Sequence, residues 1–253
     1  MKISGIIKVN NEQEIIQETL DHFSKFCNNG VYVYDDCSDD ATLSILERHK
    51  NINGIYRNLR FDKDRYRHEW QSRQTALAMA QKHSPDWICC FDADERLDVD
   101  FDDLLYLMRS PNYDAIFMKL FDAYITHYDI LNLFGSPGPP VISNYKERKY
   151  FGPEYREIGM FFRNTPYLKY HLPDQRIATF QGGYLSHGYV KHYGKAISIK
   201  QWEDTCTYYI NNFPKYAEKW KARQGKAIHD KSDFGNDLIT WDEKETKGVL
   251  LDV

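Results

Sequence analysis

The sequence contains no apolar run long enough to cross a bilayer, and its first residues do not resemble a secretory signal. A membrane-spanning helix takes about 18 consecutive apolar residues, and every apolar run among the 253 residues is much shorter. The opening stretch Met1–Lys8 is short and interrupted by polar residues, which favours a strand over a signal peptide. We therefore expect a cytoplasmic protein without a transmembrane segment.

Cysteine is scarce, and its spacing argues against two kinds of site. There are five cysteines, an odd number, and Cys89 and Cys90 are adjacent within an apolar run. Neighbouring residues of a strand point to opposite faces, so these two are poor disulfide partners. We expect them to be small apolar core residues in a reducing compartment. No Cys/His spacing is typical of a zinc site.

A large charge excess and a phosphate-binding glycine loop are also lacking. The net charge is −4, which argues against a nucleic-acid partner. A Mg²⁺-dependent nucleotidyltransferase stays open as an alternative, although no Gly-x-x-x-x-Gly-Lys-Ser/Thr loop is present to support it. A phosphatase with an aspartate nucleophile would want Asp-x-Asp-x-Thr/Val, whereas Glu95 and Arg96 follow Asp94.

What the sequence does contain is an alternation of strands and helices over its first hundred residues or so. The patterns predict strands over Ile3–Val9, Val31–Tyr34, Asn53–Arg57 and Trp87–Phe91, and helices over Glu14–Cys27, Ala41–His49 and Glu69–Lys82. The last of these strands is wholly apolar, which indicates burial on both faces, as in a parallel sheet. The alternation predicts βαβ units with right-handed crossovers.

The second part of the sequence changes character. Strands are predicted over Tyr113–Phe121, Met160–Arg163 and Thr179–Tyr184, a loop over Gly135–Pro140, and a helix over Trp202–Arg223 that Pro214 kinks or divides. There is no internal repeat or low-complexity linker. We expect one domain, 1–253, in which an α/β half (1–110) with a mainly parallel sheet precedes a mixed α+β half (111–253) with C-terminal helices.

Three predicted strands end in polar clusters. These are Asn10–Glu12, Asp35–Asp36 and Asp92–Glu95. In an open parallel sheet, ligands bind beyond the carboxyl ends of the strands where the strand order reverses. We therefore expect the three clusters to meet at one edge of the sheet, although 56 residues (92 minus 36) separate Asp36 from Asp92.

The two acids of Asp92-Ala93-Asp94 are typical of a divalent-metal site. Carboxylates at i and i+2 of an extended segment point the same way, so one ion could engage both. Mg²⁺ and Mn²⁺ prefer oxygen ligands and are usually held by one or two carboxylates together with substrate phosphates. The alternative is that acids after a strand cap the following helix or turn. The convergence with the other clusters favours the metal site.

The order of these segments resembles glycosyltransferase family 2 and its relatives with the GT-A fold. The resemblance rests on Ile3–Glu12, on Tyr34–Thr42, which is similar to an Asp-x-Ser-x-Asp-x-Thr pattern, and on Trp87–Leu97. It implies a GT-A fold in which 1–110 binds the donor and 111–253 the acceptor. It also implies a transferase that depends on Mn²⁺ or Mg²⁺ and moves a hexosyl or deoxyhexosyl group, with inversion, from a nucleotide sugar to a glycan, glycolipid or other hydroxyl acceptor. A non-catalytic nucleotide-sugar-binding module of the same fold is the alternative.

The resemblance also implies roles for individual residues. Asp36, or its neighbour Asp35, would accept a hydrogen bond from the N–H of a uracil or thymine ring, which favours UDP- or dTDP-sugars. Arg73 could reach the donor phosphates or sugar, or be an ordinary exposed helix arginine. The predicted nucleotide-sugar site comprises Asn10, Glu12, Asp35, Asp36, Arg73, Asp92, Ala93 and Asp94.

A third metal ligand and a catalytic base are predicted in the second half. By resemblance, His187, at an expected strand end and preferred to His192, joins Asp92 and Asp94 on the metal; an ordinary half-buried histidine is the alternative. A carboxylate must deprotonate the acceptor hydroxyl. The candidates are Asp174, which we favour, and Glu157.

The stretch from Lys191 to Lys231 is locally basic, with nine Lys/Arg against four Asp/Glu. Such a surface could face the diphosphate, an anionic acceptor or a membrane, so peripheral membrane contact is compatible with the sequence. A solvated helix face is the alternative.

Overall fold

The chain folds into two compact units. The structure is a computed structural model that describes residues 1–60, 69–131, 141–171, 176 and 178–251. Unit 1 comprises Met1–Lys119 and Glu157–Val190, and unit 2 comprises Leu120–Arg156 and Lys191–Val253. The predicted loop Gly135–Pro140 lies outside the described residues. The predicted division into donor and acceptor halves at residue 110 stays a prediction.

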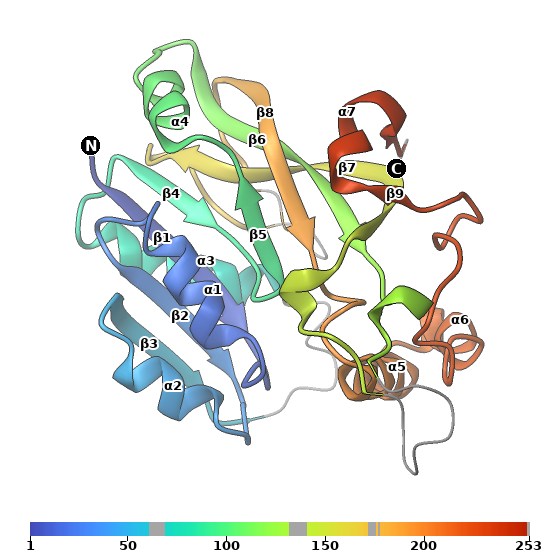
Figure 1. Cartoon of the computed structure of the whole chain (residues 1–253). Helices are drawn as coiled ribbons and strands as arrows, with labels where there is room; N and C mark the ends of the chain where they lie inside the picture. Colours follow the sequence, from blue (N-terminus) through green and yellow to red (C-terminus); the bar gives the residue numbers. More distant parts are fainter. Residues whose placement is uncertain (61–68, 132–140, 172–175, 177, 252–253) are drawn as a thin grey trace. The chain divides into compact units, whose positions relative to one another are not determined.

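Unit 1 begins with the predicted βαβ repeat (Figure 1). Its first elements are β1 (Ile3–Val9), α1 (Ile16–Phe23), β2 (Val31–Asp36), α2 (Thr42–Arg48), β3 (Ile52–Asn58), α3 (Glu69–Gln81) and β4 (Trp87–Cys90). The seven predicted elements of this region are all present, with ends that differ by a few residues. The continuous apolar run of β4 is fully buried, as expected, and Cys89 and Cys90 are free core thiols.

The central sheet has the strand order β3-β2-β1-β4-β7-β6-β8-β5. The additional elements are β5 (Glu95–Asp98), α4 (Phe101–Met108), β6 (Tyr113–Ala123), β7 (Tyr150–Arg163) and β8 (Gly183–His192). The pairs β1–β2, β2–β3 and β1–β4 are parallel, and β7 runs antiparallel to β4. The predicted α/β class is confirmed, with parallel pairing among β1, β2, β3 and β4. The strand order reverses at β1, because β2 and β3 extend the sheet on one side of β1 whereas β4 pairs with its other side.

Two strands differ from their predicted limits. The predicted strand Met160–Arg163 is only the end of the much longer β7. The predicted strand Thr179–Tyr184 is wrong in its limits, because β8 begins at Gly183 and continues to His192. Thr179 instead forms an isolated bridge with Lys169. β5 and α4 were not predicted, since neither stretch has a strong enough pattern of its own.

Unit 2 holds the C-terminal helices. They are α5 (Ile199–Asn212), α6 (Ala217–Lys221) and α7 (Lys244–Lys247), with the short strands β9 (Ile239–Thr240) and β10 (Val249–Leu250) pairing with β7. Short 3-10 turns lie at His127–Asp129, Tyr145–Glu147, Pro214–Tyr216 and Trp241–Glu243. The predicted break at Pro214 is confirmed. Trp202, Cys206 and Ala227 form a small core between α5 and the segment that follows α6.

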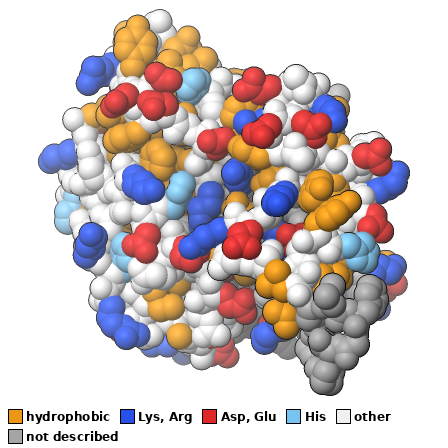
Figure 2. Space-filling model, in the orientation of Figure 1, with side chains coloured by type: hydrophobic (Ala, Val, Ile, Leu, Met, Phe, Trp, Pro, Cys, Tyr) orange, Lys and Arg blue, Asp and Glu red, His pale blue; other side chains and the backbone are white. Residues whose placement is uncertain are grey.

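The molecular surface mixes both signs of charge. Figure 2 shows Lys and Arg side chains interspersed with Asp and Glu over the face in view. None of the helices in the described residues combines the length and apolar character needed to cross a bilayer.

Close packing around Gly5 holds β1 between its two parallel partners. A Cβ atom added to Gly5 would lie 2.9 Å from Phe91 Cε1 and 3.0 Å from both Cys27 Sγ and Val31 Cγ2. Phe91 itself stacks on Phe23 with ring centroids 3.7 Å apart. No neighbour at this position can move without disturbing the sheet or α1, because interiors are packed as densely as organic crystals.

We expect Gly5→Val to lower the free energy of unfolding by about 1–3 kcal/mol, the usual cost of overpacking a core. Gly54→Val on β3 is the matched control, because its added Cβ would meet only Tyr32 Cδ1 closely, at 3.2 Å. Urea denaturation of both variants measures the difference. Equal losses would contradict the packing argument.

Candidate active site at the carboxyl edge of the parallel strands

The polar clusters after β1 and β2 are hydrogen-bonded to each other. Asn10 Nδ2 donates to the backbone oxygen of Asp36 at 2.8 Å. The backbone N–H groups of the β1 loop donate to hydroxyls of the β2 loop, Asn11 to Ser38 Oγ at 3.0 Å and Glu12 to Thr42 Oγ1 at 2.7 Å. The predicted meeting of these clusters at one edge of the sheet is confirmed.

Asp36 is buried and held on both sides at the end of β2. Its Oδ1 accepts a hydrogen bond from Asn58 Nδ2 at 3.0 Å, and Lys8 Nζ lies 3.5 Å from its Oδ2. Capping of α2 does not explain this carboxylate, because Asp40 Oδ1 accepts the hydrogen bond from the backbone N–H of Thr42 at 2.8 Å. Asp36 is thus a buried carboxylate at a strand end that does not cap α2.

Asp35 has a different environment. Its side chain is fully buried, and Oδ1 accepts a hydrogen bond from the backbone N–H of Ser38 at 3.1 Å. Its Oδ2 lies 3.6 Å from Arg57 Nε, and among the described residues no hydrogen-bond donor reaches it. This contact with Ser38 stabilises the loop that follows β2, so Asp35 contributes to the shape of the site.

The Asp92–Asp94 segment is a turn and not an extended strand. Ala93 and Asp94 form a turn that leads into β5 at Glu95. The turn is fixed because Asp92 donates its backbone N–H to Glu95 Oε2 at 2.9 Å and Thr19 Oγ1 donates to the oxygen of Ala93. The expectation that both carboxylates project from one extended segment is therefore wrong, because the side chains of Glu95 and Thr19 hold the backbone in a turn.

Two arginines hold Asp92. Arg73 Nη2, from α3, lies 3.0 Å from Asp92 Oδ1, and Arg176 Nη1 lies 3.4 Å from Asp92 Oδ2. Arg176 also forms a bidentate ion pair with Glu95, which is completely buried. Arg73 is 5% exposed, so its interpretation as an ordinary surface arginine is wrong. Both arginines fix the orientation of the Asp92 carboxylate.

Glu12 meets the acids of the turn without a cation of its own. The pKa of Glu12 is raised to about 8. Burial is the largest cause, and the nearby charges of Asp94, Asp92 and Asp40 contribute to the rise. Within the described part of the chain its carboxylate has no hydrogen-bond or ion-pair partner. Crowded carboxylates of this kind suit Mg²⁺ or Mn²⁺, which relieve the repulsion and prefer oxygen ligands.

His187, the third predicted metal ligand, does not lie at a strand end as expected. His187 lies within β8 and not at its end. No three His, Cys, Asp or Glu side chains among the described residues form a ready-made metal site, so Asp92, Asp94 and His187 do not make one by themselves. Mg²⁺-type sites that use one or two carboxylates and substrate phosphates do not need three protein ligands.

Of the two predicted bases, only Glu157 belongs to the part that the structure describes. It lies on β7, and its Oε1 accepts a hydrogen bond from Ser186 Oγ at 2.5 Å. Neighbouring strand residues point to opposite faces, so His187 faces away from the Ser186–Glu157 pair. Asp174 lies outside the described residues.

Several residues that shape the site were missed at the sequence level. Asn58 follows a predicted strand as a polar residue, the same signal that marks Asn10 and Asp36, and could have been found. Glu95 belonged to the polar cluster after the last strand predicted in the first part of the chain but was given no role, whereas Lys8 and Arg176 gave no such signal. Arg176 is 81 residues from Glu95 along the chain, and only folding brings the two together.

The model of the family described as "Glycosyl transferase family 2" matches residues 4–169. Uncharacterized proteins of Mycobacterium tuberculosis and Mycobacterium bovis are each 29% identical over 117 residues, which is 44% of this chain and 28% of theirs. The chain therefore spans little more than a quarter of the length of these relatives.

Among solved structures, the 1–349 fragment of Staphylococcus aureus TarS in complex with UDP is 16% identical, with 88% of this chain and 71% of that chain covered and a TM-score of 0.44. Glucosyl-3-phosphoglycerate synthase of Mycobacterium tuberculosis, solved with Mn²⁺, UDP and its product, is 17% identical, with coverages of 47% and 44% and a TM-score of 0.32.

The pKa of Glu12 predicts a pH dependence of stability in the absence of divalent ions. Between the ordinary pKa of 4.5 and the raised value of about 8, only the folded state keeps the proton. The free energy of unfolding should therefore fall as the pH rises through this window, by up to about 1.4 kcal/mol per pH unit. Denaturation of Glu12→Gln between pH 5 and 9 should lack this contribution. An unchanged slope in the variant would exclude Glu12 as its source.

Proposed function

Because the chain belongs to glycosyl transferase family 2, we propose that it transfers a hexosyl or deoxyhexosyl group from a nucleoside diphosphate sugar to a hydroxyl acceptor. The donor would bind at the carboxyl ends of β1, β2 and β4. The observation that carries this proposal is the meeting of Asp36, Glu12 and the Asp92–Asp94 turn at that edge, next to the point where the strand order reverses. A UDP- or dTDP-sugar is the favoured donor.

Asp36 is the proposed recognition element for the base. A carboxylate accepts from the ring N–H of uracil or thymine, whereas it cannot accept from a ring nitrogen that lacks a proton. Contacts with Asn58 and Lys8 fix the direction of this carboxylate. Asn10 ties the β1 loop to the backbone of Asp36 and so supports the same pocket.

Asp94, with Asp92 and Glu12, is proposed to hold a divalent cation together with the donor diphosphate. When bound, Mn²⁺ or Mg²⁺ supplies Lewis-acid stabilisation of the charge that develops on the departing diphosphate. Asp92 is already oriented by Arg73 and Arg176. The carboxylate of Glu12 has to lose its proton to take part, which the positive charge of the ion favours. His187 stays a proposed additional ligand.

The transfer step needs one further carboxylate. The acceptor oxygen forms a bond to the anomeric carbon while the bond from that carbon to the diphosphate oxygen breaks, and the hydroxyl proton passes to the base. Attack opposite to the leaving group inverts the configuration. We propose Asp174 as the base and keep Glu157 as the second candidate. Glu157 already accepts a hydrogen bond from Ser186.

The donor-site proposal predicts distinct losses for Asp94→Asn and Asp36→Asn. A nucleotide sugar at a hundred times its dissociation constant should add about 2.7 kcal/mol to the stability of the wild type. A thermal-shift panel of UDP-, dTDP- and GDP-sugars with and without Mn²⁺ tests this. Asp94→Asn should lose the metal-dependent part, and Asp36→Asn should bind pyrimidine nucleotides about tenfold more weakly.

Asp102→Asn is the control for these variants, because Asp102 is an exposed acid on the first turn of α4. It should behave as the wild type. If no nucleotide sugar stabilises the protein, or if Mn²⁺ makes no difference in the wild type, the proposal of a metal-dependent transferase is rejected.

If Asp174 is the general base, its replacement should affect the transfer step and leave donor binding nearly unchanged. Asp174→Asn should lower kcat by a factor of about 10²–10⁴, the usual contribution of general-base catalysis, while the dissociation constant of the donor changes by no more than about twofold. Glu157→Gln, measured in parallel, should keep most of its activity. The reverse pattern would assign the base to Glu157. A loss of donor binding in Asp174→Asn would point to a structural role.

A further inference from the structure

Asn58 lies beside Asp36 at the carboxyl edge of the sheet. The last pair of the parallel ladder between β2 and β3 aligns Asp36 with Asn58, and aligned residues of neighbouring strands point to the same face. A second contact ties the two strand ends together, because Cys37 Sγ donates to the backbone oxygen of Asn58 at 3.3 Å. Asn58 is therefore held next to the carboxylate that is proposed to recognise the base.

Two hydrogen bonds fix the side-chain amide of Asn58. Its Nδ2 donates to Asp36 Oδ1 at 3.0 Å, and its Oδ1 accepts from the backbone N–H of Arg60 at 3.2 Å. These contacts define which end of the amide carries the nitrogen, since an ionised carboxylate only accepts and a backbone N–H only donates. The plane of the amide is thus set before a ligand arrives.

One N–H group of Asn58 is left for a ligand. An amide nitrogen carries two N–H groups, and only the one directed at Asp36 has an acceptor among the residues that the structure describes. Asn58 is half-buried and not enclosed in the core. The ends of β2 and β3 therefore present a hydrogen-bond acceptor, the Asp36 carboxylate, next to a hydrogen-bond donor, the second N–H of Asn58.

An acceptor next to a donor selects among the nucleobases. Uracil, thymine and guanine carry a ring N–H beside a carbonyl oxygen, which matches this pair. Cytosine and adenine carry a ring nitrogen without a proton beside an amino group. That edge sets a lone pair against the carboxylate and an N–H against the amide N–H. Both mismatches leave polar groups unpaired, which is how a hydrogen-bonding site rejects an analogue.

We propose that Asn58 is a specificity-determining residue of the donor site. Its second N–H donates to the carbonyl oxygen that lies beside the base N–H accepted by Asp36. The inference rests on the proposed function, in which a uracil or thymine nucleotide binds at this edge. It adds a second point of recognition to the carboxylate, and together the two residues separate UDP from CDP.

Equilibrium binding of UDP and CDP in the presence of Mn²⁺ tests the proposal. The wild type should bind UDP about tenfold or more tightly than CDP, because CDP leaves both groups unpaired. Asn58→Ala should weaken UDP binding about three- to tenfold, the size of one hydrogen bond, and change CDP binding by less than about twofold. Asn53→Ala is the matched control, because Asn53 lies near the start of the same strand and its Nδ2 donates to the backbone oxygen of Asn29 at 3.3 Å. It should bind both nucleotides as the wild type does.

Thio-substituted nucleotides separate a direct contact of Asn58 with the base from an effect through Asp36. Sulfur is a weaker hydrogen-bond acceptor than oxygen, so sulfur at the contacted position should weaken binding. The wild type should bind either 2-thio-UDP or 4-thio-UDP more weakly than UDP. Asn58→Ala should bind that analogue and UDP equally well.

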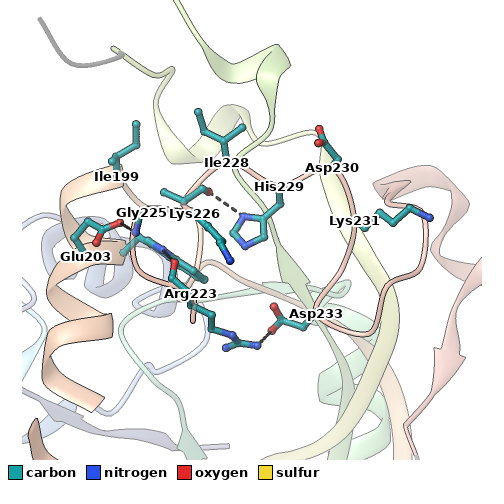
Figure 3. A pocket seen from close by; sticks show the side chains of 12 residues that line it. Ile199, Glu203, Arg223, Gly225, Lys226, Ile228, His229, Asp230, Lys231 and Asp233 are labelled. Atoms are coloured by element: carbon teal, nitrogen blue, oxygen red, sulfur yellow. Dashed lines mark hydrogen bonds and ion pairs between the residues drawn. The ribbon is translucent and has the colours of Figure 1, made fainter. Parts of the chain in front are cut away.

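A cavity of unit 2 is the other place where a nucleotide could bind in these assays. It has a volume of about 600 Å³ and lies between α5 and the segment 223–233. Figure 3 shows that its lining carries acids and cations in equal number: Glu203, Asp230, Asp233, Arg223, Lys226 and Lys231. This lining has no excess of positive charge to attract a diphosphate, so Lys226→Gln should leave the binding of UDP unchanged.

Three outcomes overturn the inference and leave the proposed function in place. In the first, the wild type binds UDP, and both thio analogues bind as tightly as UDP. In the second, Asn58→Ala keeps its melting temperature but binds UDP as the wild type does, or loses UDP and CDP binding equally. In the third, UDP binding depends on Lys226. If Asn58→Ala does not fold, the analogues decide on the wild type alone. If no nucleotide binds the wild type, the proposed function is rejected together with the inference.

Discussion

The parallel pairing of β1 with β2 on one side and β4 on the other is the constraint on which the candidate site depends. Parallel strands end at the same edge of a sheet, so loops that are distant in the sequence are forced together there. The close packing of Gly5 against Phe91 and Val31 shows how little room this arrangement leaves. The position of Asp36, Glu12 and Asp92 at a common edge is a consequence of backbone pairing, and their own side chains oppose it by repulsion.

The protein balances this repulsion in several ways. Asp92 is neutralised by Arg73 and Arg176 from two other parts of the chain. Asp36 has Lys8 as its cation. Glu12 has none among the described residues, and its raised pKa means that it holds a proton near neutral pH. A divalent ion bound with a diphosphate, as proposed, would exchange that proton for a stronger interaction.

Unit 2 shows the opposite balance. Burial acts to raise the pKa of Asp122, but Lys195, His192 and Arg156 outweigh it and hold the pKa well below its usual range. Lys195 also serves Asp233, so cations outnumber acids around these carboxylates. The basic stretch seen in the sequence between residues 191 and 231 is therefore partly consumed by internal ion pairs.

The sequence by itself determined the order of the βαβ elements, the burial of Trp87–Cys90 and the meeting of three polar clusters, because periodicity and strand ends are local properties. It also carried the resemblance that the family match confirms, and with it the GT-A fold. Tertiary structure alone decided that Asp92–Asp94 is a turn, that Arg73 is buried on Asp92, and that Arg176 reaches Glu95 from 81 residues away. These features depend on which distant side chains fill the space around a buried charge, and no local pattern encodes that choice.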